Sequence, residues 1–118
     1  MVKTVIKPWG RELWVAHNER YAGKFIYVKK GESLSKQYHE KKHETLYILV
    51  GKALLSLGDK NKIISHEDKN KVYIIKPGTV HRIKALTDCI FVEFSSPELD
   101  DCIRLSDEYG RCENGRIK

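Results

Sequence analysis

The sequence has little cysteine: Cys89, Cys102 and Cys112 are its three cysteines, and no two of them form a C-x-x-C pair. Three cysteines cannot all pair within one chain, and small domains that depend on disulfides usually carry an even and larger number. We therefore expect free thiols, a reducing compartment, and small buried side chains at these positions. Apolar residues make up 41% of the chain, which is enough for one hydrophobic core without disulfides.

Long hydrophobic runs are also missing. No stretch approaches the ~18 consecutive apolar residues of a membrane span, and the N-terminal sequence MVKTVIKPWG lacks the apolar run of a secretory leader. There are no repeats, low-complexity tracts or linkers. These absences predict a cytoplasmic protein that does not bind membranes and that forms a single domain over residues 1–118.

Charge of one sign is not concentrated anywhere along the chain. Lys and Arg number 22 against 16 Asp and Glu, a net charge of +6, but the lysines are scattered singly or in pairs with acids between them. A nucleic-acid surface would show clustered cations with interleaved aromatics, so no nucleic-acid partner is expected. The excess positive charge is compatible with a small anionic partner such as a phosphorylated metabolite.

Helical periodicity is scarce and appears, weakly, only in residues 96–110. The chain instead contains short runs rich in β-branched and aromatic residues, bounded by turn formers. Gly51 separates two of these runs and suggests a tight hairpin turn. Such a series predicts an all-β sandwich or barrel with nine or so strands. The predicted strands are 12–16, 24–28, 33–39, 45–50, 52–57, 62–65, 72–75, 81–85 and 90–94.

One segment, His39-Glu40-Lys41-Lys42-His43, matches the H-E-x-x-H pattern of zinc proteases. That pattern binds zinc only on a helix, where positions i and i+4 share a face. Here the following run, TLYILV, has no 3.6-residue periodicity and is typical of a buried strand. We therefore expect residues 40–42 to form a loop between two strands, and a protease is not favoured.

A second grouping in the same region suits a metal site inside a β-barrel. Gln37 and His39 are two residues apart on a strand and so face the same side. Glu44 begins the next strand, and His81 lies three residues after Gly78 at the start of another. Two imidazoles, a carboxylate and an amide oxygen suit a borderline divalent ion, zinc first, with manganese, iron, cobalt or nickel as alternatives. Open positions would remain for water or a substrate oxygen.

Several motifs follow one another along the chain in a recognisable order. They are Lys7-Pro8-Trp9-Gly10, Leu34-Ser35, Gln37-x-His39-x4-Glu44-x6-Gly51, Pro77-Gly78-x-x-His81, His81-Arg82-Ile83, Glu93, Asp101–Arg104 and Asp107-Glu108-Tyr109-Gly110-Arg111. Together they resemble the cupin superfamily and, within it, the C-terminal isomerase domain of type II phosphomannose isomerases. The resemblance implies a jelly-roll barrel (double-stranded β-helix) over about residues 5–95. It also implies a segment over 96–111 that closes over the barrel, and a tail at 112–118.

The resemblance further implies a function in carbohydrate metabolism, namely metal-dependent isomerisation of mannose 6-phosphate or another phosphorylated or activated sugar. The 118 residues contain no counterpart of the nucleotidyltransferase domain that precedes this module in bifunctional enzymes, so guanylyl transfer is not expected. Cupin barrels commonly pair through edge strands, which implies a homodimer.

Candidate residues for this chemistry follow from the same comparison. Glu93 is the first candidate for the base that carries the proton, and His43 is the second. Glu93 could instead orient a metal ligand through a hydrogen bond. Arg104 and Arg111 match family positions that resemble phosphate binders, and arginine suits phosphate by its bidentate geometry. Weaker candidates for binding the substrate are Arg11, Lys36 and Tyr109, the last through a turn that would place Arg111.

Other functions remain compatible with the same residues. The site could bind a metal and a carbohydrate without catalysis. The absence of a catalytic base at the site would favour this function. A site with two histidines and one carboxylate could also hold iron for oxygen chemistry. These alternatives are separated by turnover of sugar phosphates, by the effect of Glu93→Gln, and by oxygen consumption with ferrous iron.

Overall fold

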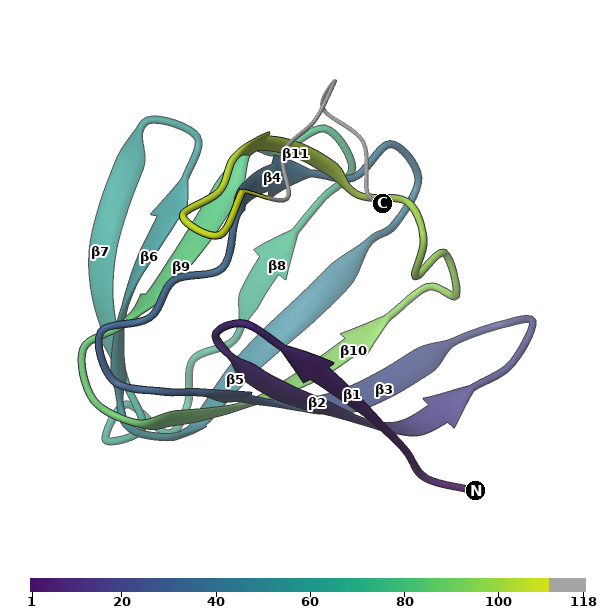
Figure 1. Cartoon of the computed structure of the whole chain (residues 1–118), viewed down its shortest axis with the longest axis horizontal. Coiled ribbons are helices and arrows are strands. Elements are labelled where there is room, and N and C mark those ends of the chain that lie inside the picture. Colours follow the sequence, from purple (N-terminus) through teal and green to yellow (C-terminus); the bar gives the residue numbers. More distant parts are fainter. Residues whose placement is uncertain (111–118) are drawn as a thin grey trace.

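The computed structural model describes residues 1–110, which form two antiparallel β-sheets that face each other across a shared interior (Figure 1). The six-stranded sheet has the order β1-β2-β3-β10-β5-β8, and the five-stranded sheet has the order β11-β4-β9-β6-β7. The strands are β1 (Lys3–Lys7), β2 (Gly10–His17), β3 (Ala22–Val28), β4 (Lys36–Tyr38), β5 (Glu44–Val50), β6 (Lys52–Leu57), β7 (Lys60–Ser65), β8 (Tyr73–Ile75), β9 (His81–Ala85), β10 (Cys89–Ser95) and β11 (Ile103–Ser106).

The all-β prediction is confirmed, and each of the nine predicted runs falls on a strand. The two strands that were not predicted, β1 and β11, are short and lie at sheet edges. The weak helical expectation for 96–110 is wrong. Within that range β11 forms and pairs with β4, so its backbone hydrogen bonds go to a strand that lies more than 60 residues earlier in the sequence. Local periodicity carries no information about such a pairing.

The expected hairpin turn at Gly51 is also wrong. β5 lies in the six-stranded sheet and β6 in the five-stranded sheet, so Gly51 is a corner at which the chain crosses between them. Its φ is +97°, and a Cβ atom there would lie 2.3 Å from the carbonyl oxygen of Asp88. Glycine is therefore required both by the left-handed backbone and by the close approach of a neighbouring chain.

Strand alternation sends charged residues as well as apolar ones into the interior. On β3, Lys24 is in phase with Ile26 and Val28, and all three are buried. On β10, Glu93 is likewise in phase with buried Phe91. The apolar core fills one part of the space between the sheets, and the buried charges gather in another. Among residues 1–110, no helix is long and apolar enough to cross a membrane.

Candidate metal centre

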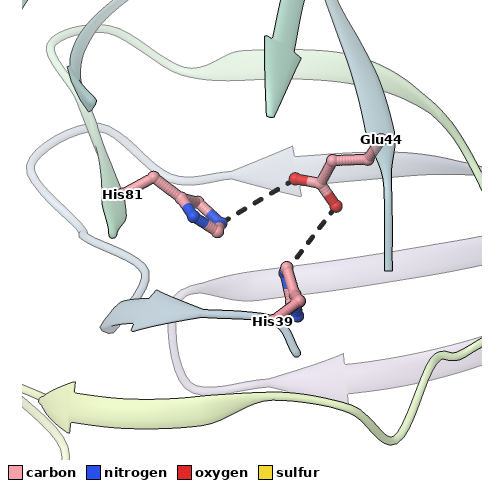
Figure 2. A group of neighbouring side chains, drawn as sticks. All are labelled: His39, Glu44 and His81. Carbon is pink, nitrogen blue, oxygen red and sulfur yellow. Dashed lines mark ion pairs between the residues drawn. The ribbon is translucent and has the colours of Figure 1, made fainter. Parts of the chain in front are cut away.

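Three side chains with metal-binding atoms converge between the sheets (Figure 2). One ligand atom each from His39, Glu44 and His81 lies within 4.8 Å of the other two, and all three residues are buried. The Nε2 atoms of both histidines lie 3.8 Å from the Glu44 carboxylate, one from each oxygen. Ligand atoms around a single tetrahedral zinc ion lie ~3.3 Å apart, given bonds of about 2.0 Å. The three groups are therefore close to a coordinating arrangement.

The three side chains lie at or beside strand ends. His39 directly follows β4, Glu44 opens β5 and His81 opens β9. Gln37 on β4 is the register partner of His81 on β9, which brings the two histidine-bearing segments together. Residues 40–42 form a loop rather than a helix, and Glu40 is exposed. The geometry that a zinc protease requires is therefore absent from this segment.

Backbone hydrogen bonds fix the orientation of both imidazole rings. Nδ1–H of His39 donates to the carbonyl oxygen of Asp101 at 2.7 Å, and Nδ1–H of His81 donates to the carbonyl oxygen of Thr79 at 2.9 Å. Burial and the positive charge of Lys42 lower the pKa of His39 to about 4, and burial lowers the pKa of His81. Both rings are thus neutral at pH 7, with the Nε2 lone pair directed at Glu44. This is the usual arrangement of metal-binding histidines, whose other nitrogen donates to a fixed acceptor.

A chain of buried charges extends from the three candidate ligands across the six-stranded sheet. The Lys42 ammonium lies 2.9 Å from Glu44 and 3.1 Å from Glu93. The Lys24 ammonium lies 3.6 Å from Glu93 and 3.1 Å from Glu12. All five side chains are buried, so each charge depends on its neighbours for compensation.

The two carboxylates that share Lys42 titrate very differently. Burial and the neighbouring Glu93 raise the pKa of Glu44 to about 7, against the opposing effect of Lys42. Burial would also raise the pKa of Glu93, but Lys42 and Lys24 lower it to about 2. Burial works against the charge of Lys42, yet Glu93 and Glu44 raise its pKa well above the ordinary range. Glu93 is therefore ionised at neutral pH, and Glu44 is the weaker acid of the two because its pKa is higher.

These groups line a cavity of about 440 Å³. Gln37 and the buried Arg104 also line it, as do Leu99, Asp100 and Cys102 from the segment after β10. The amide oxygen of Gln37 accepts a hydrogen bond from the thiol of Cys102. The cavity thus brings together all four predicted metal ligands, Glu93 and one predicted phosphate binder.

The other predicted site residues lie elsewhere. His43 is exposed, and its backbone N–H donates to Ser96. Arg11 is exposed and stacks on the ring of Tyr27, 4.2 Å from its centroid, because it lies on the outer face of β2. Lys36 is exposed, one residue out of phase with Gln37 on β4. Tyr109 donates its hydroxyl to Glu32 and contacts the core, and Arg111 lies outside the described residues.

Sequence reasoning missed several residues of this region. Lys24 carried a signal, since it alternates in phase with core residues of its own strand. Glu12 on β2 is also buried, and its register partner is the core residue Ile26. Lys42 and Asp101 carried no such signal, because they lie outside strands and their direction is set by tertiary contacts.

The chain is similar in sequence to a known family and to several characterised proteins. The family model described as "Mannose-6-phosphate isomerase C-terminal" matches residues 1–107. Mannose-1-phosphate guanylyltransferase ManC of Salmonella typhimurium is 34% identical over 116 residues, which is 94% of this chain and 24% of that protein. The chain therefore spans about a quarter of the length of this relative.

Solved structures share the fold at lower identity. The capsular polysaccharide assembling protein CapF of Staphylococcus aureus has a TM-score of 0.77 at 18% identity, covering 91% of this chain and 32% of that one. An RmlC-like cupin from Shewanella frigidimarina has a TM-score of 0.73 at 14% identity, covering 85% of this chain and 87% of that one. The chain has the cupin fold and belongs to the mannose-6-phosphate isomerase C-terminal family.

Proposed function

We propose that this chain binds a divalent metal ion through His39, Glu44 and His81 and isomerises a phosphorylated sugar between its aldose and ketose forms. The observation that carries the proposal is the convergence of two neutral, oriented imidazoles and one carboxylate in a cavity between the sheets. The chain belongs to the mannose-6-phosphate isomerase C-terminal family, so mannose 6-phosphate and fructose 6-phosphate are the first substrates to test.

The donor set fits a borderline divalent ion, with zinc as the first choice and manganese, iron, cobalt or nickel as alternatives. Gln37 would add a fourth donor after its amide oxygen leaves the thiol of Cys102. When bound, the metal supplies Lewis-acid stabilisation of the negative charge that develops on the sugar oxygens.

The charge of the cavity favours an anionic ligand. Its buried ionisable lining comprises three carboxylates and three cations, which cancel when Glu44 is ionised and both histidines are neutral. A divalent ion therefore makes the cavity positive, and a sugar phosphate would be attracted to it. Arg104 is the buried cation that we assign to the phosphate, since guanidinium groups bind phosphate in a bidentate manner.

Glu93 is the proposed proton acceptor, because it lines the cavity and is ionised at neutral pH. Lys42 and Lys24, however, make it a weak base, since they lower its pKa to about 2. That observation favours a second candidate function, in which the site binds a metal and a sugar phosphate without turnover.

One experiment tests both. Zinc- or manganese-loaded protein is incubated with mannose 6-phosphate or fructose 6-phosphate in D₂O and followed by NMR. An isomerase interconverts the two sugars and introduces deuterium at the exchanging carbon, and Glu93→Gln should slow this by about 10²–10⁴-fold. Glu40→Gln, in the exposed part of the neighbouring loop, is the matched control and should keep full activity.

Each result assigns a function. Binding of the sugar phosphate without interconversion, unchanged in Glu93→Gln, supports the binding function. If the metal-loaded protein neither binds nor converts any hexose or pentose phosphate, both functions are ruled out. Loss of activity in Glu40→Gln would show that the effect of Glu93→Gln is not specific to the cavity.

We also propose that the chain forms a homodimer through the outer face of the six-stranded sheet. Cross-strand register places Leu13, Phe25, Val92 and Tyr47 in one row across β2, β3, β10 and β5. Phe94 is 58% exposed on the same face. A sheet face in contact with water usually alternates to polar residues, so an apolar outer face indicates a covering surface.

A second copy of the chain suits this face in size and in charge. Five strands spaced about 4.8 Å apart and about six residues long measure roughly 24 by 20 Å. That flat area of roughly 480 Å² is more than half of the ~800 Å² per partner that stable interfaces bury, before the projecting side chains are counted. The central row carries no charge, so two copies can meet there without the repulsion expected between chains of net charge +6.

Phe94→Lys is therefore expected to turn a dimer into a monomer, as measured by light scattering after gel filtration. Ile63→Lys is the control, because Ile63 is 68% exposed on β7 of the other sheet and should leave the dimer intact. If the wild-type protein has the mass of one chain at ~100 μM, well above the dissociation constants of specific interfaces of this size, the interface proposal is wrong.

A further inference from the structure

We propose that Asp101 is a positioning residue that sets the geometry of the metal centre by holding the loop between His39 and Glu44. This inference rests on the proposed metal site. It concerns a residue that touches no predicted ligand with its side chain, and it assigns that residue a role in metal affinity rather than in catalysis.

The side chain of Asp101 binds the backbone of three consecutive loop residues. Its carboxylate accepts hydrogen bonds from the N–H groups of Glu40, Lys41 and Lys42, at 3.1, 2.5 and 2.9 Å. A carboxylate bound by several backbone N–H groups is among the stronger acceptors in proteins. These hydrogen bonds fix the course of the chain between the two ligands that flank the loop.

The backbone of Asp101 acts on the first ligand directly. Its carbonyl oxygen accepts the Nδ1–H of His39 at 2.7 Å, which leaves Nε2 as the nitrogen that faces Glu44. One residue therefore fixes both the loop and the ring that precedes it. The carboxylate anchors the backbone of Asp101, and the anchored carbonyl in turn selects the tautomer of His39.

The far end of the loop is held by the same C-terminal segment. The backbone N–H of His43 donates to the Ser96 hydroxyl at 2.9 Å, and the Ser96 N–H donates to the His43 carbonyl at 3.0 Å. Glu44 follows immediately. Residues 96–101 thus contact the loop along its length, and Asp101 supplies most of those hydrogen bonds.

The test compares Asp101→Asn with a matched control. Asp88 also accepts a backbone N–H, from Lys30 at 2.8 Å, but it lies in the turn before β10, away from the metal centre. Zinc affinity is measured by competition titration of the full chain. Asp101→Asn is expected to weaken zinc binding by about 10–100-fold, the usual effect of losing a residue that orients a ligand. Asp88→Asn should stay within about twofold of wild type, since it touches no group that orients a ligand.

A second readout needs no metal. The ¹⁵N shifts of His39 in the metal-free protein should show the Nδ1–H tautomer in wild type and in Asp88→Asn, and a mixture of tautomers in Asp101→Asn. Should Asp101→Asn fail to fold, hydrogen exchange in the wild-type protein replaces it. The amides of residues 40–42 should then be protected, and exchange at the rate of an open loop would overturn the proposal.

The outcomes separate this inference from the proposed function. If wild type binds zinc and Asp101→Asn binds it equally well with an unchanged His39 tautomer, the positioning role is wrong. If Asp88→Asn weakens zinc binding as much as Asp101→Asn does, the effect is general destabilisation, and the role is again wrong. If wild type binds no divalent metal while the tautomer changes as expected, the proposed function fails and the action of Asp101 on His39 stands.

Discussion

Zinc binding is expected to fall by more than ~100-fold when Glu44 is replaced with glutamine, because even residues that only orient a ligand contribute 10–100-fold. Glu44 is the anionic member of the three converging groups, and both histidine Nε2 atoms lie 3.8 Å from its oxygens. The amide keeps the shape of the side chain and removes its charge. His81→Ala is expected to have an effect of the same order.

Metal content after dialysis and calorimetric titration measure this effect. His66→Ala is the control for general histidine binding, because His66 is exposed and its Nδ1 interacts with the backbone of Gly51. Circular dichroism of each variant checks that the sheet structure is intact. A folded Glu44→Gln protein that retains wild-type zinc affinity would show that the metal, if any, binds elsewhere.

The second large effect is on stability. Lys42→Met is expected to lower the free energy of unfolding by about 3–5 kcal/mol, the typical cost of leaving a buried charge without its partner. The Lys42 ammonium lies within 3.1 Å of both Glu44 and Glu93, and all three side chains are buried. Methionine fills similar space, so the loss reflects charge rather than a cavity. Such a loss is a large share of the ~5–15 kcal/mol that stabilises a typical domain.

Urea unfolding of the metal-free protein measures this loss. Lys41→Met, at the exposed neighbouring position, should change stability by no more than about 0.5 kcal/mol. Excess zinc should recover part of the loss in Lys42→Met, because a divalent cation beside Glu44 restores positive charge. A loss below about 1 kcal/mol, the average for point mutations, would mean that the two carboxylates do not depend on this lysine.

Much of the fold and the candidate metal ligands could be predicted from local patterns. Alternation along a strand is a property of neighbouring residues, so it can be used before folding to tell which strand residues share a face. The same property placed Gln37 and His39 on one side of β4, and both line the cavity. The positions of Glu44 and His81 at the starts of predicted strands indicated that they could meet, and the structure places them close together with His39.

Residues outside the strands could not be placed in this way. Lys42 reaches the interior because its loop is held by Asp101, about 60 residues later in the chain.

Arg11 and Lys36 were expected at the substrate, but each lies on the outer side of its strand, one residue out of phase with an inward neighbour. Charge and motif position alone do not contain that phase.

The amino-acid sequence by itself determined nine of the strands and the candidate metal ligands, because side-chain direction in a strand depends only on nearby residues. Only the tertiary structure decided that Lys24 and Lys42 share Glu93, that β11 pairs with β4, and that Asp101 binds the loop. Those contacts join segments far apart in the sequence, and they form only when folding brings the two sheets together.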